Sequence, residues 1–512
     1  MSKSLRLSRV SVALLLSAAA PSFAAPTLVA LSGTPSPTGS NYSLFGSQAI
    51  NSAGQVTFQA AVGSATSNVS SIFTGTPGSI STVATQGGFP PTGTNSFNLF
   101  NGILAVPPAS TSGQVVFGAS LTDGLTPVTN KGYGAYLYSG GTLTTLAQNG
   151  DASPGGGGNF AFTAIPTPVM NPSGQYAFGA ALTGGTAAAG LFMGSGGSLS
   201  KVALLGEAAP GGGTYATTFA SATINGSGQV VFASAISGAL GLFGGSPGSL
   251  SRIMLQGTAA PGANGAAYAS VSSGYSINDA GQIAFQSSLT PVSPDTTTTT
   301  GVFAGPFGSV QAVAVRGQAA PAGGNYNSFS GVSIDGGGRT YFSSGLTGGS
   351  STSGLFTNSG GVTQAIALLG GAAPIAGTTF TTSFGSVIPN ASGQIVFTAT
   401  LAGAGVTGSN DSVLVCGKPG DLGILLREGD QIDVDPTAGV DMRTINGSIS
   451  LLVGAGGQDG KGTALNDSGM VAFKVTFTDL STGVFTIMVP EPSSLALVGL
   501  LGAGLIRRRG RN

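Results

Sequence analysis

Residues 171–182 read NPSGQYAFGAAL, and this stretch decides the fold because nearly the same phrase returns along the whole chain. Five close copies begin with Asn and occupy residues 51–62, 225–236, 278–289, 390–401 and 466–477. Two looser copies, at 110–121 and 335–346, begin with Ser110 and Asp335 instead. The eight copies predict a protein built from tandem structural repeats.

Each copy starts with the residues of a tight turn. In the stretch above, Asn171 fits the first corner of a type I turn, where its side chain caps backbone amides, and Pro172 fits the second corner. Gly174 fits the fourth position because glycine adopts a positive φ at no steric cost. We therefore expect the turn residues of the close copies to serve folding before any ligand: Asn51, Gly54, Asn171, Gly174, Asn225, Gly228, Asn278, Gly281, Asn390, Gly393, Asn466 and Gly469.

Each repeat contains enough sequence for four strands. One strand precedes the Asn and one follows the turn, and an aromatic strand such as GLFMG (190–194) and a further strand such as SLSKVALLG (198–206) come next. A connector of the type AAPGGG (208–213) closes the unit. Between Gly54 and Gly469 the mean period is about 59 residues, which is typical of propellers or arrays. The sequence thus predicts an all-β protein, a β-propeller of eight four-stranded blades.

The two ends of the repeat region predict how the ring closes. The first segment, TLVALSG at 27–33, looks like a fourth strand without its predecessors, whereas the last unit has its second strand (469–477) and third strand (483–489) but no fourth. We expect residues 27–32 to pair with residues 483–489, because this pairing covers two sheet edges at once. The alternative is an open tandem β-repeat array, which leaves both edges exposed.

The composition favours a folded sheet protein and excludes several kinds of site. Of the 512 residues, 41% are hydrophobic and 7% are charged, so a core can be buried in spite of 88 glycines. Without the basic residues of the two terminal segments and Glu491, the body keeps ten basic and sixteen acidic residues and no basic cluster, which argues against nucleic-acid binding. The absence of histidine excludes Ser-His-Asp, Cys-His and His-containing zinc sites. The single Cys416 is expected to be a buried small residue, with a reactive thiol as the alternative.

The first 24 residues have the features of a secretory signal peptide. Basic residues precede an apolar run from Val10 to Ala20, and small residues stand at Ser22 and Ala24. We expect cleavage after Ala24 by a signal peptidase. The domains predicted on this basis are the signal peptide (1–24), the repeat propeller (25–489) and a terminal segment (490–512).

The terminal segment has three parts in order. Pro490, Glu491 and Pro492 are followed by an apolar run of twelve residues, 495–506, and then by Arg507, Arg508 and Arg509. This run is shorter than the ~20 residues that span a bilayer comfortably, which suits a transient membrane contact. The arginines are expected to stay on the cytoplasmic side.

This tripartite tail closely resembles the PEP-CTERM sorting signal of Gram-negative bacteria. The resemblance implies recognition of Pro-Glu-Pro by an exosortase, a membrane-embedded transpeptidase-like protease, and a location at the cell surface or in the extracellular matrix. It also implies a producer of extracellular polysaccharide. The repeats at 27–488 resemble tandem Asn-x-x-Gly repeat proteins that carry interchangeable carboxy-terminal anchors, PEP-CTERM among them, and this second resemblance adds location rather than chemistry.

The stretch REGDQIDVDPTAGVD, at 427–441, replaces the connector between the seventh and eighth units. It gathers Glu428 with four aspartates that are candidate ligands of a calcium ion: Asp430, Asp433, Asp435 and Asp441. The spacing matches no EF-hand. Two other interpretations stay open, a solvated loop whose aspartates cap turns and a carboxylate pair for glycoside cleavage. Asp459 and Asp467 are candidates for the same rim. No other cofactor is expected.

These features leave three hypotheses for function. The preferred one is a non-enzymatic, exported surface or matrix protein whose propeller serves adhesion or association with the exopolysaccharide of a biofilm. A second is an extracellular glycan-acting enzyme that uses the carboxylates at 428–441. A third is a purely structural envelope protein that self-associates.

Overall fold

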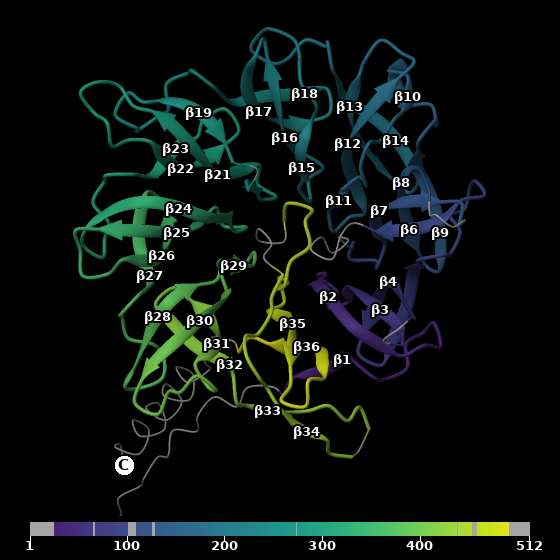
Figure 1. Ribbon diagram of the computed structural model, residues 1–512. Helices are drawn as coiled ribbons and strands as arrows, with labels where there is room; N and C mark the ends of the chain where they lie inside the picture. Colours follow the sequence, from purple (N-terminus) through teal and green to yellow (C-terminus); the bar gives the residue numbers. More distant parts are fainter. Residues whose placement is uncertain are drawn as a thin grey trace, which may run out of the picture.

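The computed structural model describes residues 25–64, 67–100, 109–124, 129–272, 274–437, 439–452 and 458–490. Their strands are arranged as blades around a ring (Figure 1). Within these ranges the one helical element is a 3₁₀ turn at Pro154–Gly156. No helix long and apolar enough to cross a membrane occurs in the described part of the chain.

Seven blades follow one plan, in which antiparallel strands pair in chain order from the hub to the rim. In blades 3, 5 and 7 the first strand is broken into two short pieces. Blade 1 consists of β2 (Tyr42–Ile50), β3 (Val56–Ser64), β4 (Ser67–Thr76) and β5 (Ser79–Thr85). Blade 2 consists of β6 (Ser96–Phe100), β7 (Val115–Thr122), β8 (Asn130–Ser139) and β9 (Thr142–Gln148). Blade 3 consists of β10 (Asn159–Phe160), β11 (Val169–Met170), β12 (Gln175–Thr183), β13 (Ala189–Ser195) and β14 (Ser198–Leu204).

The plan continues through the second half of the chain. Blade 4 consists of β15 (Ala220–Ile224), β16 (Val230–Ile236), β17 (Ala239–Ser246) and β18 (Ser249–Leu255). Blade 5 consists of β19 (Ala267–Val271), β20 (Ser276–Ile277), β21 (Gln282–Thr290), β22 (Thr300–Pro306) and β23 (Gln311–Val315). Blade 6 consists of β24 (Asn325–Ile334), β25 (Thr340–Thr347), β26 (Ser353–Ser359) and β27 (Val362–Leu368). Blade 7 consists of β28 (Thr378–Phe384), β29 (Ile388–Pro389), β30 (Ile395–Gly403), β31 (Ser412–Lys418) and β32 (Asp421–Arg427), and a small hairpin of β33 (Gln431–Asp433) and β34 (Met442–Thr444) follows it.

Blade 8 joins the two ends of the chain. Its sheet runs in the order β1 (Thr27–Leu31), β36 (Thr482–Met488) and β35 (Met470–Thr476). Thr27 lies opposite Thr486 and Leu31 lies opposite Gly483, and the backbone N–H of Ser32 extends the pairing to the carbonyl of Thr482 at 2.9 Å. The predicted eight-bladed ring, closed by the first strand, is confirmed, and the open array is wrong.

The eighth blade departs from the four-stranded prediction at its inner edge. In place of a continuous first strand, the described residues of 445–452 and 458–465 meet the blade at three isolated bridges, which join Ile445 to Phe477, Ser450 to Lys474, and Leu465 to Val471. The reason is that part of this segment, residues 458–463, is bonded to other blades across the hub. Within the described residues, blade 8 therefore has three regular strands.

Paired phenylalanines hold the second and third strands of most blades together. Phe232 lies directly opposite Phe243 in blade 4, with ring centroids 5.7 Å apart and the rings stacked. Tyr215 from the inner side of the same blade meets Phe243 edge-on at 5.2 Å. All three side chains are buried. Such aromatic pairs add stability beyond the area they bury, which explains why the aromatic strand recurs in the sequence.

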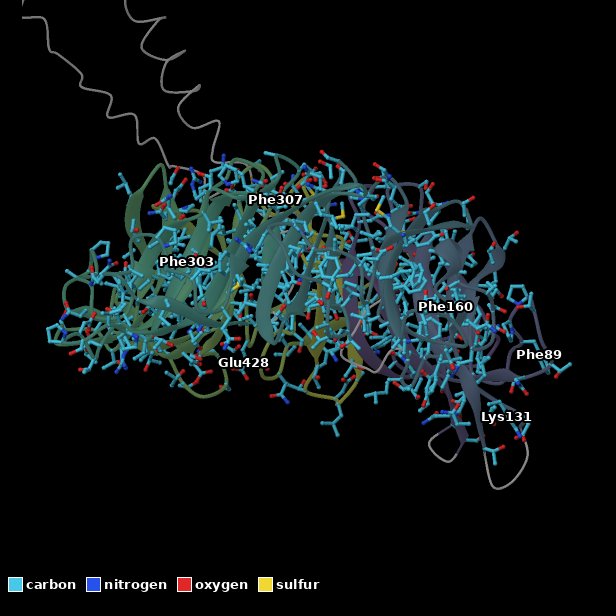
Figure 2. The ribbon with its side chains drawn as sticks, turned by 90° about the horizontal axis from the view of Figure 1, so that it is seen from above. Phe89, Lys131, Phe160, Phe303, Phe307 and Glu428 are labelled. Atoms are coloured by element: carbon cyan, nitrogen blue, oxygen red, sulfur yellow. The ribbon has the colours of Figure 1, made fainter. Side chains whose placement is uncertain are left out.

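The ring has two faces that differ in what they carry. We call the Asn-turn face the one that holds the turns between the first and second strands of each blade, such as residues 171–174. Because the strands are antiparallel, the turns between third and fourth strands lie on the same face. Figure 2 shows Phe307, from such a turn, on one side of the ring and Lys131 and Glu428 on the other.

Both ends of the described chain lie on the Asn-turn face. At the carboxyl end of β36, the N–H of Val489 donates to the carbonyl of Gly469, which belongs to the turn of blade 8. Strand β1 begins beside this point, since Thr27 pairs with Thr486. The described chain therefore begins and ends on one face of the propeller.

Candidate functional site

The asparagine of each turn connects two neighbouring blades. In blade 4 the side-chain oxygen of Asn225 accepts the backbone N–H of Gln229 at 2.8 Å, which caps the turn. The amide nitrogen of Asn225 donates to Oε1 of Gln229 and also to the backbone carbonyl of Asn278 in blade 5, both at 2.8 Å. Asn225 is fully buried, so each of these bonds is shielded from water.

The same link recurs around the ring. The amide donors and the carbonyls that accept from them are Asn51 with Ser110, Asn171 with Asn225, Asn278 with Asp335, Asn390 with Asn466, and Asn466 with Asn51. The last of these joins blade 8 to blade 1. Ser110 and Asp335 have no amide nitrogen and make no such bond; at the first of these junctions the N–H of Thr111 donates to the carbonyl of Pro172 instead.

The glycine of each turn lies under a side chain of the preceding blade. Gly281 has a φ of +73°, and a Cβ placed there would lie 2.9 Å from Oε1 of Gln229. The same glutamine oxygen is held by Asn225. The motif Asn-x-x-Gly-Gln thus acts as a unit, in which the asparagine holds the glutamine and the glutamine covers the next glycine. The sequence-predicted turn residues come together as a structural ring on the Asn-turn face.

The acidic stretch forms the β33–β34 hairpin, on the face opposite the turns. Oδ1 of Asp433 accepts the N–H of Asp435 at 3.0 Å and that of Asp441 at 2.9 Å. Oδ1 of Asp435 accepts the N–H of Thr437 at 2.7 Å, and its bonds to Thr437 lower the pKa of this carboxyl below its usual range. Both aspartates therefore shape the hairpin locally.

The remaining acids of this stretch are engaged separately. Asp441 pairs with Arg443 at 2.8 Å, and Oδ2 of Asp430 accepts the N–H of Arg427 at 2.7 Å. Burial raises the pKa of Asp430. Oε1 of the buried Glu428 accepts the N–H of Gly447 at 2.7 Å. The structure does not bring the four candidate calcium ligands together, and no group of three or more acidic or cysteine side chains suited to a metal occurs among the described residues.

The hub of the ring is filled by residues 458–463, which we call the hub segment. Its carbonyls accept backbone N–H groups from three blades: Ile224 donates to Asp459 at 3.0 Å, Met170 to Gly460 at 2.8 Å, and Ile50 to Thr463 at 2.8 Å. Oε1 of Gln458 accepts the N–H of Asp279 in a fourth blade at 3.1 Å. Figure 1 shows this yellow part of the chain, ahead of β35, in the centre of the ring.

A buried carboxylate lies in the hub segment. Asp459 is completely buried, and burial raises the pKa of its carboxyl. Oδ2 of Asp459 lies 3.5 Å from Nζ of Lys461 and has no hydrogen-bond partner among the described residues. Lys461 also donates to the carbonyl of Tyr275 at 3.0 Å and lies over the Tyr275 ring. The adjoining cavity, lined by Asn466 and Asp467 among others, measures only about 40 Å³, which is room for a few water molecules.

Sequence reasoning missed the hub segment and misplaced two acids. Asp459 and Asp467 do not join the rim of the acidic hairpin: Asp459 lies in the hub, and Oδ1 of Asp467 accepts the N–H of Ala391 on the Asn-turn face at 2.8 Å. The available signal was the stretch QDGKGT, which interrupts the strand pattern expected ahead of Asn466 with two charges and two glycines.

Cys416 and the two terminal segments are the remaining candidates from the sequence. Cys416 is buried in β31, and burial raises the pKa of its thiol to about 12. Pro490 is the last described residue. Residues 1–24, Glu491, Pro492, Arg507, Arg508 and Arg509 lie outside the described ranges.

Comparisons with known proteins identify a family for this chain but no activity. A family model described as "Family of unknown function (DUF7453)" matches residues 50–496. No curated protein matches the chain.

Solved structures with a similar fold include propeller domains of peptidases. The β-propeller domain of the Trilobed protease from Pyrococcus furiosus is 8% identical, with 76% of this chain and 100% of that chain covered and a TM-score of 0.38. Prolyl oligopeptidase B from Galerina marginata is 10% identical over 87% of this chain and 55% of that chain, with a TM-score of 0.41. A puromycin-hydrolyzing peptidase of Mycobacterium tuberculosis is 13% identical over 76% and 51% of the two chains, with a TM-score of 0.37. The chain spans about half the length of the latter two, and at these identities the likeness concerns the fold alone.

Proposed function

The chain belongs to the DUF7453 family, whose function is unknown, and we propose that it is an exported, non-enzymatic surface or matrix protein whose propeller associates with extracellular polysaccharide. The signal-peptide pattern at 1–24 and the PEP-CTERM-like tail at 490–512 support the location. Signal peptidase and an exosortase are the partners that this proposal requires during export.

The observation that carries the proposal is the common exit of both chain ends from the Asn-turn face. The N–H of Val489 is bonded to Gly469 in a turn of that face, and β1 starts beside it. A tail held at the envelope would keep the whole closed ring on one side of its attachment point. The rim and the opposite face, with the β33–β34 hairpin, would remain free to meet a polymer.

Two further features support binding rather than turnover. The hub, where a propeller offers a natural mouth for a substrate, is occupied by residues 458–463 with about 40 Å³ beside them. The carboxylates of the hairpin each accept local hydrogen bonds or pair with arginine, and a glycosidase needs two carboxyl groups that face one sugar.

The test uses residues 25–489 and the extracellular polysaccharide of the source organism. The protein and polymer are incubated with calcium or with a chelator, and both co-sedimentation and polymer length are recorded. We expect retention of the protein without shortening of the polymer. Shortened polymer would overturn the non-enzymatic role, and the absence of retention would overturn polysaccharide association.

The hairpin variant Asp433→Asn separates the calcium interpretation from this role. If the hairpin holds calcium for polymer binding, retention should fall on chelation in the unaltered protein and should be insensitive to chelation in the variant. Equal retention in all four conditions would show that the hairpin acids serve only their turns.

The proposed export requires the three-part tail. We expect that replacing Glu491 with alanine leaves the protein associated with the membrane fraction in unprocessed form, because an exosortase would no longer recognise Pro490–Pro492. The full-length chain and the variant are compared by fractionation and by intact mass. Identical processing of both would contradict the sorting role of the tail.

A further inference from the structure

A cavity of about 300 Å³ lies between blades 6 and 7, apart from the hub. Blade 6 contributes Arg339, Thr357, Ser359 and Gln364 to its lining, and blade 7 contributes Lys418. These residues lie next to turns of the Asn-turn face: Arg339 follows the turn of blade 6, and Lys418 ends β31. The cavity lies beyond the buried interface in which Tyr341 and Leu355 of blade 6 pack with Phe397 and Val413 of blade 7.

Both cations of this cavity depart from the repeat. Six turns have glutamine directly after their glycine: Gln55, Gln114, Gln175, Gln229, Gln282 and Gln394. Blade 6 has Arg339 there instead, and its guanidinium lies over Gly393 of blade 7, with Nη1 2.9 Å from the point where a Cβ would stand. Lys418 occupies the position filled by hydroxyl residues or proline in the matching turns: Thr76, Ser139, Ser195, Ser246, Pro306 and Ser359.

The convergence of the two cations at one junction places positive charge where other junctions have none. Only ten basic residues occur between residues 25 and 489, and two of them line this cavity. Neither Arg339 nor Lys418 forms an ion pair with a described carboxylate, although five other basic–acidic pairs are found in the described chain. Asp421 lies across the turn from Lys418 in the strand pairing without closing such a pair.

The carboxylate that shares the neighbourhood of Arg339 is already engaged. Asp335 is buried, its Oδ1 accepts the N–H groups of Gly337 and Arg339 at 2.9 and 2.8 Å, and its Oδ2 accepts the hydroxyl of Tyr341 at 2.9 Å. These bonds fix it as a turn cap. The cavity itself is thus lined by two cations, by uncharged polar groups and by the apolar Val362 and Pro419, with no carboxylate among its lining residues.

One buried hydroxyl group beside the cavity, that of Thr357, lacks a hydrogen-bond partner among the described residues. Thr357 is 4% exposed and lines the cavity. The matching hydroxyl of Thr74 in blade 1 is bonded to Thr57 at 3.0 Å. Buried polar groups without a partner are rare and costly, so a small rotation of Thr357 toward a ligand oxygen in the cavity would give Oγ1 a hydrogen bond that it lacks in the free protein.

We propose that this cavity binds the carboxylate-bearing sugar unit of an acidic polysaccharide, that is, a uronate. Arg339 and Lys418 would hold the carboxylate by charge-assisted hydrogen bonds. Thr357, Ser359 and Gln364 would meet the ring hydroxyls. The volume is at the lower end of the range for small-molecule sites and suits a sugar ring, whereas an inorganic anion would leave most of it empty.

The lining also decides against a neutral sugar. No aromatic side chain lines the cavity, so stacking contributes nothing, and a neutral unit would leave both cations without an ion-pair partner among the described residues. Recognition would depend on charge and fall with added salt. The inference rests on the proposed function for the polymer, but the preference for a carboxylate rests on Arg339 and Lys418 alone.

The test compares two double variants that lose the same charge. Arg339→Gln with Lys418→Ser restores residues that stand at these positions in other repeats, so the blades should fold. Arg252→Gln with Arg316→Gln is the control, because both arginines lie on other blades and neither lines the cavity. Affinity for polygalacturonate is measured by titration calorimetry, with neutral dextran, monomeric galacturonate and inorganic phosphate as parallel probes.

We expect the cavity variant to lose at least tenfold in affinity for polygalacturonate and for the monomer, while the control changes less than twofold. Dextran should not bind. Equal losses in the two variants would show a general charge effect and overturn the site, as would phosphate that binds as well as the monomer. If the unaltered protein retains the source polysaccharide and the cavity variant retains it equally, the proposed function stands and the site fails. If polygalacturonate binds through the cavity but the source polysaccharide is not retained, the site stands and the proposed function fails.

Discussion

At the scale of single residues, the turn asparagine makes two kinds of hydrogen bond at once, one within its own turn and one to the next blade. Its carbonyl oxygen caps its own turn, as Asn225 does for Gln229, and its amide nitrogen reaches the carbonyl of the next blade at Asn278. Aspartate and serine can make the first bond without the second. Asp335 illustrates this, because it caps its turn with Oδ1 and gives no bond to blade 7.

The first prediction replaces Asn225 with aspartate. The cap to Gln229 should survive, while the bond to Asn278 is lost and a carboxylate is buried against a carbonyl. We expect the free energy of unfolding to fall by about 3 kcal/mol, the cost of an unsatisfied buried group with added charge. Urea denaturation followed by circular dichroism measures it. The exposed Asn327, replaced by aspartate, is the control and should change little; an equal effect at both positions would contradict the interblade link.

The second prediction separates backbone strain from crowding at glycine. Gly281 and Gly308 both have positive φ, +73° and +80°, but only Gly281 lies under a neighbour, Oε1 of Gln229, whereas nothing lies within 4 Å of a Cβ at Gly308. Alanine at either site costs about 1 kcal/mol for the left-handed backbone. We expect Gly281→Ala to cost about 1–2 kcal/mol more than Gly308→Ala, because Gln229 is held in place. Equal melting temperatures for the two variants would show that the side chain of Gln229 moves away from residue 281 at no measurable cost in stability.

At the scale of elements, the closing strand was visible in the sequence because a strand stood alone at one end and one was missing at the other. The phrase TLVALSG and the absence of a fourth strand after 483–489 were enough to predict the β1–β36 pair. The loss of a regular first strand in blade 8 was not foreseen. Its cause is hydrogen bonding to Ile50, Met170 and Ile224 in other blades, and local patterning carries no information about such partners.

The third prediction concerns β1. A chain that starts at Gly33 should leave the edge of β36 unpaired and expose the apolar residues that β1 covers, such as Val484. We expect this chain to self-associate, because open strand edges template pairing with other chains. Light scattering after size exclusion measures it, and a synthetic peptide of residues 25–33 should restore the monomer. A truncated chain that stays monomeric with unchanged stability would show that closure contributes little.

At the scale of the whole molecule, the hub segment ties blades on different sides of the ring to one another through Asp459, Gly460 and Thr463. It also places the fully buried carboxylate of Asp459 in the hub. Lys461 is the charged group that faces this carboxylate, and Tyr275 lies beside the lysine. The pair therefore makes the stability of the assembled ring depend on pH.

The fourth prediction gives the sign of that dependence. Burial raises the pKa of Asp459 in the folded protein above its value in the unfolded chain. The folded state therefore binds the proton more tightly, and the free energy of unfolding should rise as the pH falls from neutral through the raised pKa, down to the ordinary range of an aspartate. The comparison is with Asp459→Asn, which cannot titrate. The stability difference between the two proteins should shift in favour of the unaltered chain on acidification, and a difference that is constant with pH would contradict the burial effect.

The candidate sites were harder to predict from the sequence than the fold, because they depend on which side chains meet in space. The hairpin acids are close in sequence, and proximity suggested a shared ion, but Asp433, Asp435 and Asp441 are each used by a nearby N–H or by Arg443. Arg339 and Lys418 are 79 positions apart, so their meeting depends on how two blades pack. Comparison of the repeats with one another would have flagged both as departures, without showing that they share a cavity.

The pairing of β1 with β36 also sets an order of events along the chain. The first described strand, β1, bonds to the last, β36, and the residues Ser32 and Thr482 that extend this contact are 450 positions apart. Blades 1 to 7 contain their own strands and can form as the chain emerges, but the circle can be completed only after residue 488 is available. Loop-closure entropy grows slowly with length, so the delay costs time more than free energy. Strand β1 must therefore stay unpaired until β36 has been made, and its capture completes the ring.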